Sequence, residues 1–66
     1  MSSVDELKAE IKKLSARAMS MKMNLHDLSE ELPVNWQTIM SVAQDTYDSY
    51  AALEAARKKL KEVEAA

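Results

Sequence analysis

The residue with the clearest capacity for chemistry in this sequence is His26, the single histidine of the chain. Met19 and Met23 precede it by seven and three residues, and Glu30 follows it by four, so these residues share one face of a helix. A neutral imidazole is a frequent ligand of nickel, zinc, iron and copper, and carboxylates complete or orient such sites. The pattern predicts a divalent transition metal at His26. Its possible supporting residues are Met23, Glu30 and Asp27.

One histidine is too few to close a metal site within a single chain. A two-fold dimer would place a His26 from each subunit near its axis, because symmetry duplicates any group that lies there. The alternative is that His26 is an ordinary surface histidine and that the carboxylates around it point into water, as most surface charges do. The sequence leaves both interpretations open.

Hydrophobic spacing indicates the elements that must position His26. Apolar residues step by three and four without a break through the first half of the chain, which is a heptad seam and predicts a helix over about 4–31. Pro33 ends this helix, and Asn35 is a suitable N-cap for a second helix over about 36–62, after a turn at 32–35. The first seam comprises Val4, Leu7, Ile11, Leu14, Ala18, Met21, Leu25, Leu28 and Leu32. The second comprises Ile39, Ala43, Thr46, Tyr50, Leu53, Leu60 and Val63, with Ala56 or Arg57 between.

Two long helices joined by so short a turn must lie antiparallel, so the 66 residues form one all-α domain, a helical hairpin. A core this small needs further stabilisation by a disulfide, a metal or a partner chain, and the chain has no cysteine to form a disulfide. We therefore expect a homodimer, a four-helix bundle formed by two hairpins.

The half of the hairpin near the turn carries apolar residues beyond the seam, which is typical of an interaction surface. The segment 23–50 has no lysine or arginine but five carboxylates, whereas the rest of the chain is net positive. If two turn ends overlap in a dimer, acidic surfaces approach one another and favour a cation. The alternative is that the apolar residues only thicken the core of the hairpin. The expected dimer or partner interface comprises Met19, Met23, Trp36, Met40 and Tyr47.

Composition excludes several classes of function. The formal net charge is −2 and the basic residues are interspersed with glutamate, so we expect no nucleic-acid binding. No apolar run is long enough to span a bilayer, and the N-terminus does not resemble a signal peptide, so we expect no membrane and a cytoplasmic location. Catalysis is not expected, because the sequence offers no pairing of a nucleophile with a base.

A family resemblance adds a biological setting. The stretch KKLSARAMSMKMNLHDLSEELPVNWQTIM, followed by AQDTYDSYAALEAARKKL, resembles the small Rop-like family of unknown function encoded in nitrogen-fixation gene clusters. The segment 22–28 around His26 and the turn motif from Leu32 and Pro33 to Trp36 are its specific parts. The resemblance implies a dimeric helical hairpin whose histidine is associated with divalent metal binding, a role that falls on His26. It also implies a part in nitrogen fixation, in metal supply or nitrogenase cofactor assembly.

Two functions follow from these features. In the first, a non-enzymatic dimer associated with nitrogen fixation binds a divalent metal through His26 from each subunit. In the second, the chain is a protein-binding adaptor whose methionine, tryptophan and tyrosine surface docks a larger partner, such as a nitrogen-fixation protein, without a physiological metal.

Overall fold

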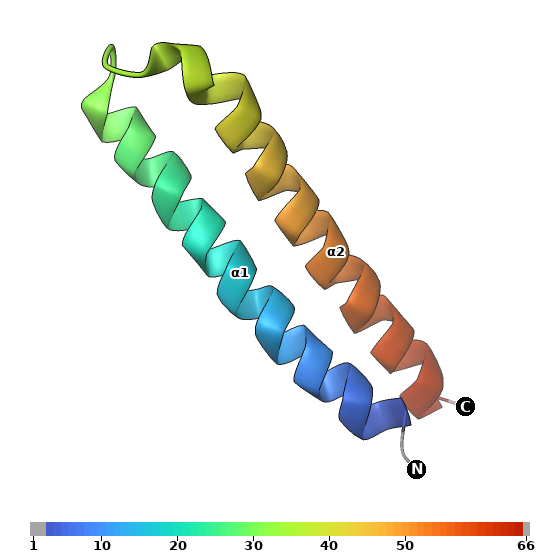
Figure 1. Ribbon diagram of the computed structural model, residues 1–66. Coiled ribbons are helices and arrows are strands. Elements are labelled where there is room, and N and C mark those ends of the chain that lie inside the picture. Colours follow the sequence, from blue (N-terminus) through green and yellow to red (C-terminus); the bar gives the residue numbers. More distant parts are fainter. Residues whose placement is uncertain (1–2, 66) are drawn as a thin grey trace.

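The computed structural model describes residues 3–65, which form two long antiparallel helices (Figure 1). Helix α1 spans Ser3–Glu31 and helix α2 spans Ile39–Ala65, with the short 3₁₀ helix η1 at Trp36–Thr38 leading into α2. The two chain ends lie at one end of the rod and the turn lies at the other (Figure 1). The predicted all-α hairpin is therefore confirmed.

Helix α1 uses the predicted seam. Leu7, Ala18 and Leu28 are buried. The other seam residues up to residue 25 are partly buried, namely Val4, Ile11, Leu14, Met21 and Leu25. Leu32 was expected to end the seam but is exposed, because it follows the last helical residue and turns away with the loop.

Helix α2 faces its partner through most of the predicted stripe, including Ala43, Thr46 and Leu60, but with a substitution at its centre. Ser49 and Leu53 are buried. Of the two residues predicted for the position between Leu53 and Leu60, Ala56 is partly buried and Arg57 is exposed. Tyr50 was expected in the seam but is exposed, because the helix is rotated so that Ser49 takes that place. Ile39 and Val63, at the two ends of the predicted stripe, are exposed as well.

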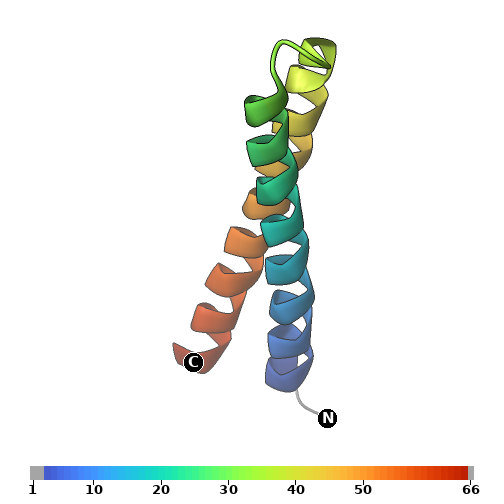
Figure 2. The same ribbon diagram turned by 90° about the vertical axis from the view of Figure 1, so that its left-hand side faces the viewer.

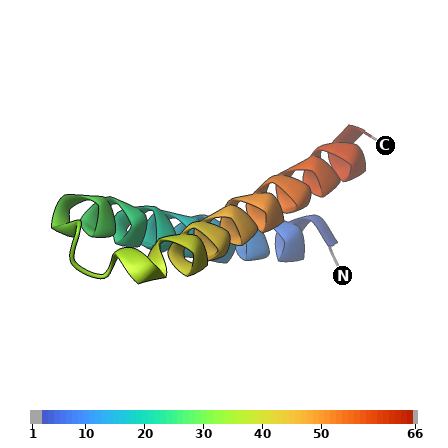
Figure 3. The ribbon, with the colours of Figure 1, turned by 90° about the horizontal axis from the view of Figure 1, so that it is seen from above.

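The helices cross near their middle and diverge toward both ends (Figures 2 and 3). Ala18, with 1% of its surface exposed, is the most buried residue of the core, and it lies in the middle of α1. Thr46 marks the register between the helices, because its hydroxyl lies 3.2 Å from the Met21 carbonyl oxygen while it also bonds the Val42 carbonyl of its own helix at 2.8 Å. This register puts Ser49 level with Ala18, so two small residues permit the close approach.

The turn is built from backbone hydrogen bonds at residues 32–35. The Val34 amide donates to the Glu31 carbonyl at 2.9 Å, and the Leu32–Pro33 peptide bond is cis. Asn35 is the N-cap residue of η1, as predicted, but its side chain makes no capping hydrogen bond. It adopts a left-handed conformation (φ 62°), and its carbonyl accepts hydrogen bonds from the amide and hydroxyl of Thr38.

Because those bonds make a 3₁₀ turn first, the α-helical part of the second helix begins at Ile39 rather than at the expected Trp36, and it continues to Ala65 rather than to about residue 62. The first helix begins at Ser3, one residue before the expected start.

Candidate functional site: an exposed histidine on an apolar side of the hairpin

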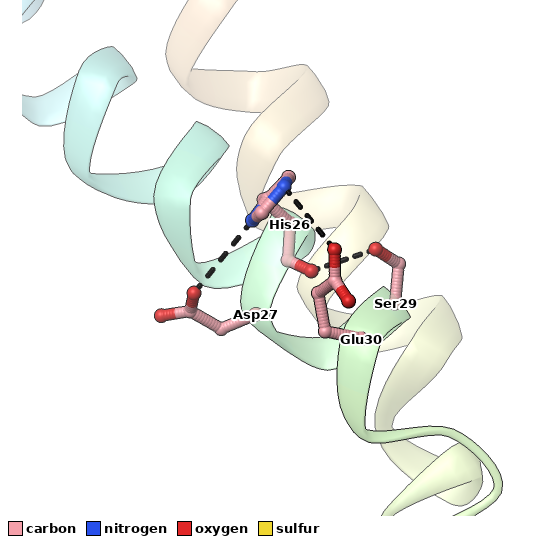
Figure 4. Close-up of polar contacts among 4 residues, drawn as sticks. All are labelled: His26, Asp27, Ser29 and Glu30. Atoms are coloured by element: carbon pink, nitrogen blue, oxygen red, sulfur yellow. Dashed lines mark hydrogen bonds and ion pairs between the residues drawn. The ribbon is translucent and has the colours of Figure 1, made fainter.

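His26 lies on the penultimate turn of α1 with 63% of its side chain exposed. Its Nε2 lies 3.6 Å from Glu30 Oε1 and its Nδ1 lies 3.8 Å from Asp27 Oδ1 (Figure 4). The Ser29 hydroxyl donates a hydrogen bond to the backbone carbonyl of His26 at 2.6 Å, so it leaves the ring free (Figure 4). The imidazole therefore stands between two carboxylates, at distances longer than a direct hydrogen bond.

No cluster of three or more metal-ligating side chains exists among residues 3–65. His26 and Glu30 could supply two ligands from adjacent turns of α1, with Nε2 directed toward Glu30. A tighter site needs at least one further ligand from outside the chain, such as a second His26 or water. Met19 and Met23 lie on the same stripe of α1 as His26, and both are exposed.

The hairpin has two long sides of different character. One side, which we call the polar side, is marked by grooves whose lining residues on α2 include Ser41, Asp45, Asp48 and Ala52. These residues step by three and four, so they lie on one face of the helix.

Four of the five carboxylates in the turn-end half border the grooves of the polar side. Asp27 and Glu31 of α1 line one groove, and Asp45 and Asp48 of α2 line another, where Arg17 joins them. The expected approach of acidic surfaces in a dimer thus depends on which side forms the interface.

The opposite side, which we call the apolar side, carries the exposed large apolar residues. On α1 these are Met19 and Met23, four residues apart, and His26 follows at helical spacing. On α2 the spacing of three and four recurs, and Met40 is 79% exposed and Tyr47 71% exposed. The residues of the apolar side are Met19, Lys22, Met23, His26, Glu30, Trp36, Met40, Ala43, Tyr47 and Tyr50.

The five residues predicted for an interface are all exposed. Exposed apolar surface of this extent is typical of an interaction site. Tyr50, which the α2 stripe predicted for the core, is exposed and belongs instead to the apolar side. The spacing of 40, 43, 47 and 50 contained that signal, because it continues the stripe of Met40 and Tyr47.

Within residues 3–65, neither helix is both long and apolar enough to cross a membrane.

Comparison with known proteins gives a consistent family assignment. A family model described as Rop-like matches residues 2–65. A UPF0437 protein of Azorhizobium caulinodans is 66% identical over 65 residues, covering 98% of this chain and 94% of the relative. A UPF0437 protein of Sinorhizobium fredii is 45% identical over 60 residues, covering 91% of this chain and 90% of the relative.

Two further relatives add a genomic location and a solved structure. A protein of Frankia alni, named for its place in the nifX–nifW intergenic region, is 44% identical over 43 residues, which are 65% of this chain and 52% of that protein. The NMR structure of a structural-genomics target protein shares 46% identity with this chain. The alignment covers 98% of this chain and 92% of that one, with a TM-score of 0.91.

Proposed function

The chain belongs to the Rop-like family, and from this premise we propose that it is a small, non-enzymatic binding protein that serves nitrogen fixation. The Frankia relative supports that setting, because its name places it between two nif genes. A cytoplasmic location is part of the proposal, since nothing in the chain's composition calls for an oxidising compartment.

We propose that the protein acts as a homodimer that binds a divalent transition metal through His26 of each subunit. The observation that carries this proposal is the exposed imidazole on the apolar side, with Glu30 Oε1 3.6 Å from its Nε2. A second copy that covers the apolar side brings a second imidazole and a second carboxylate to the same place. Such a set of nitrogen and oxygen donors suits nickel, zinc, iron or copper, and the role would be metal supply or cofactor assembly.

A second candidate function is protein docking without a metal. It is favoured by the exposure of Trp36, Met40 and Tyr47, which exceeds what a hairpin needs for its own core. Methionine-rich surfaces repack readily against different partners, so this surface would suit an adaptor that binds a larger nitrogen-fixation protein.

Titration of nickel and zinc ions into the protein, followed by residue-resolved NMR and calorimetry, tests the metal site. We expect a single ion per dimer, with the largest changes at His26 and Glu30. The variant His26→Ala should lose this binding and keep its helical content by circular dichroism.

Asp45→Asn is the matched control, because Asp45 lies on the polar side and its loss should leave metal affinity unchanged. If His26→Ala binds the ions as tightly as the native chain, or if the NMR changes spread over the carboxylates of the polar side, the metal proposal is wrong. The adaptor function predicts instead that His26→Ala keeps partner binding while Met23→Asp or Met40→Asp loses it.

A further inference from the structure

The register between the helices places every residue of the apolar side along the rod. Thr46 is level with Met21, because its hydroxyl lies 3.2 Å from the Met21 carbonyl oxygen. Asn24 and Val42 line one groove, and Leu14 and Ala52 line another, so the same antiparallel register holds along the hairpin to within about one residue.

Counting from the bond between Thr46 and Met21 gives the position of each α2 residue relative to α1. Tyr50 comes level with about residue 17 of α1, Tyr47 with about residue 20, Met40 with about residue 27 and Trp36 with about residue 31. The apolar side therefore extends from about level 17 to about level 31, and its midpoint lies near level 24. Met23 and His26 flank this midpoint on α1.

We infer that a second copy of the chain packs antiparallel on the apolar side in partial overlap, with the two-fold axis crossing the rods between Met23 and His26. This inference rests on the proposed dimer and adds its register. An axis between two apolar sides sets α1 against α1 and α2 against α2 of the second copy. The two His26 rings then lie about 6 Å apart along the rod, since each is about two residues from the axis.

The same register pairs the aromatic residues. Trp36 of one copy comes level with Tyr50 of the other and lies within about one helical turn of its Tyr47. Offset-stacked or edge-to-face contacts between these rings stabilise an interface beyond the area that they bury. The turn end of each copy's apolar side therefore covers the opposite end of the other copy's apolar side.

Charge also favours partial overlap. On the apolar side, the half of the rod near the chain ends is lined by Lys8, Lys12 and Arg57. A full-length antiparallel overlap would place Met40 against the level of Lys8 and bury these cations next to apolar side chains, which is costly without partners. In partial overlap Lys8, Lys12 and Arg57 stay in water, so among residues 3–65 Lys22 is the one cation of this side that each copy brings into the overlap. The four carboxylates of the polar side face away from the interface.

The overlap is small, so the dimer should be sensitive to concentration. The rod is 14 Å wide, and an overlap of roughly 21 Å along it gives a flat footprint of roughly 300 Å² on each copy. Standard interfaces bury about 800 Å² per partner. An ion held by both His26 residues would therefore strengthen this dimer measurably.

Distances between spin labels on the two copies test the register directly, because the chain has no native cysteine. Glu10→Cys and Asn24→Cys both place the label at an exposed position that lines a groove of the polar side, away from the interface. In partial overlap the residue-10 labels are offset by about 42 Å along the rod and the residue-24 labels by about 0 Å. In full overlap both offsets are about 21 Å.

Circular dichroism of each labelled chain serves as the fold control, and sedimentation establishes that dimers are present at the concentration measured. A long distance at residue 10 together with a short one at residue 24 supports the inference. Equal distances at the two positions, a short distance at residue 10, or a chain that stays monomeric at millimolar concentration overturns it.

The outcome is separable from the test of the proposed function. If the register is as inferred but His26→Ala binds metal normally, the metal proposal fails and the inference holds. If the labels report full overlap while metal binding still depends on His26, the inference fails and the metal proposal holds.

Discussion

Replacing Ala18 with leucine should destabilise the hairpin, because the two helices approach one another at this residue. Ala18 is 1% exposed and is level with Ser49, which is 5% exposed. Leucine adds three carbon atoms, and burying each would contribute about 0.8 kcal/mol if there were room. There is no room unless the helices separate, and overpacking of this kind typically costs about 1–3 kcal/mol.

That cost is large for a chain of this size. At about 0.05–0.15 kcal/mol per residue, the total stability is roughly 3–10 kcal/mol. Each kcal/mol changes the Tm of a domain this small by about 4–8 °C, so Ala18→Leu should lower the Tm by roughly 5–20 °C. The measurement is thermal unfolding followed by circular dichroism, with all chains at one concentration because an oligomer shifts the Tm by mass action.

Ala51→Leu is the matched control. Ala51 is exposed on α2, and alanine and leucine have similar helix propensities, so its Tm should change little. If Ala18→Leu unfolds at the temperature of the native chain, then the layer of Ala18 and Ser49 does not set the distance between the helices, and the account of the crossing is wrong.

Three further outcomes are expected. Asn35→Val should destabilise the turn by about 1–2 kcal/mol in thermal unfolding, because a β-branched residue disfavours the left-handed conformation at φ 62°, whereas Asn35→Gly should not. Thr46→Val should lower the free energy of unfolding in urea by about 0.5–1.5 kcal/mol, because it removes the partly buried hydroxyl that lies within hydrogen-bonding distance of the Met21 and Val42 carbonyls; an unchanged midpoint would contradict a stabilising role for this hydroxyl. Met40→Asp should keep the helical content of the native chain and weaken self-association in sedimentation, because Met40 is 79% exposed on the apolar side; unchanged association would exclude that side as the dimer interface.

The sequence was sufficient to predict the two helices, the position of the turn and the inward-facing residues of α1. Its apolar residues step by three and four over the whole of α1, and the proline after Leu32 can only end that helix. It was also sufficient to select His26 and the exposed residues around it, because these are chemical types at helical spacings. The metal at His26 remains a prediction, since it depends on a partner that one chain does not contain.

Only the tertiary structure decided how α2 turns toward α1. Ser49 and Tyr50 are neighbours in sequence, and either fits a seam of three and four, but the helices cross closely beside Ala18 and only the smaller side chain fits there. The same rotation sends Tyr50 to the side of His26 and leaves Asp45 and Asp48 on the other side. Periodicity determines that a helix has an inner face, whereas packing against a second helix determines which residue stands at its centre.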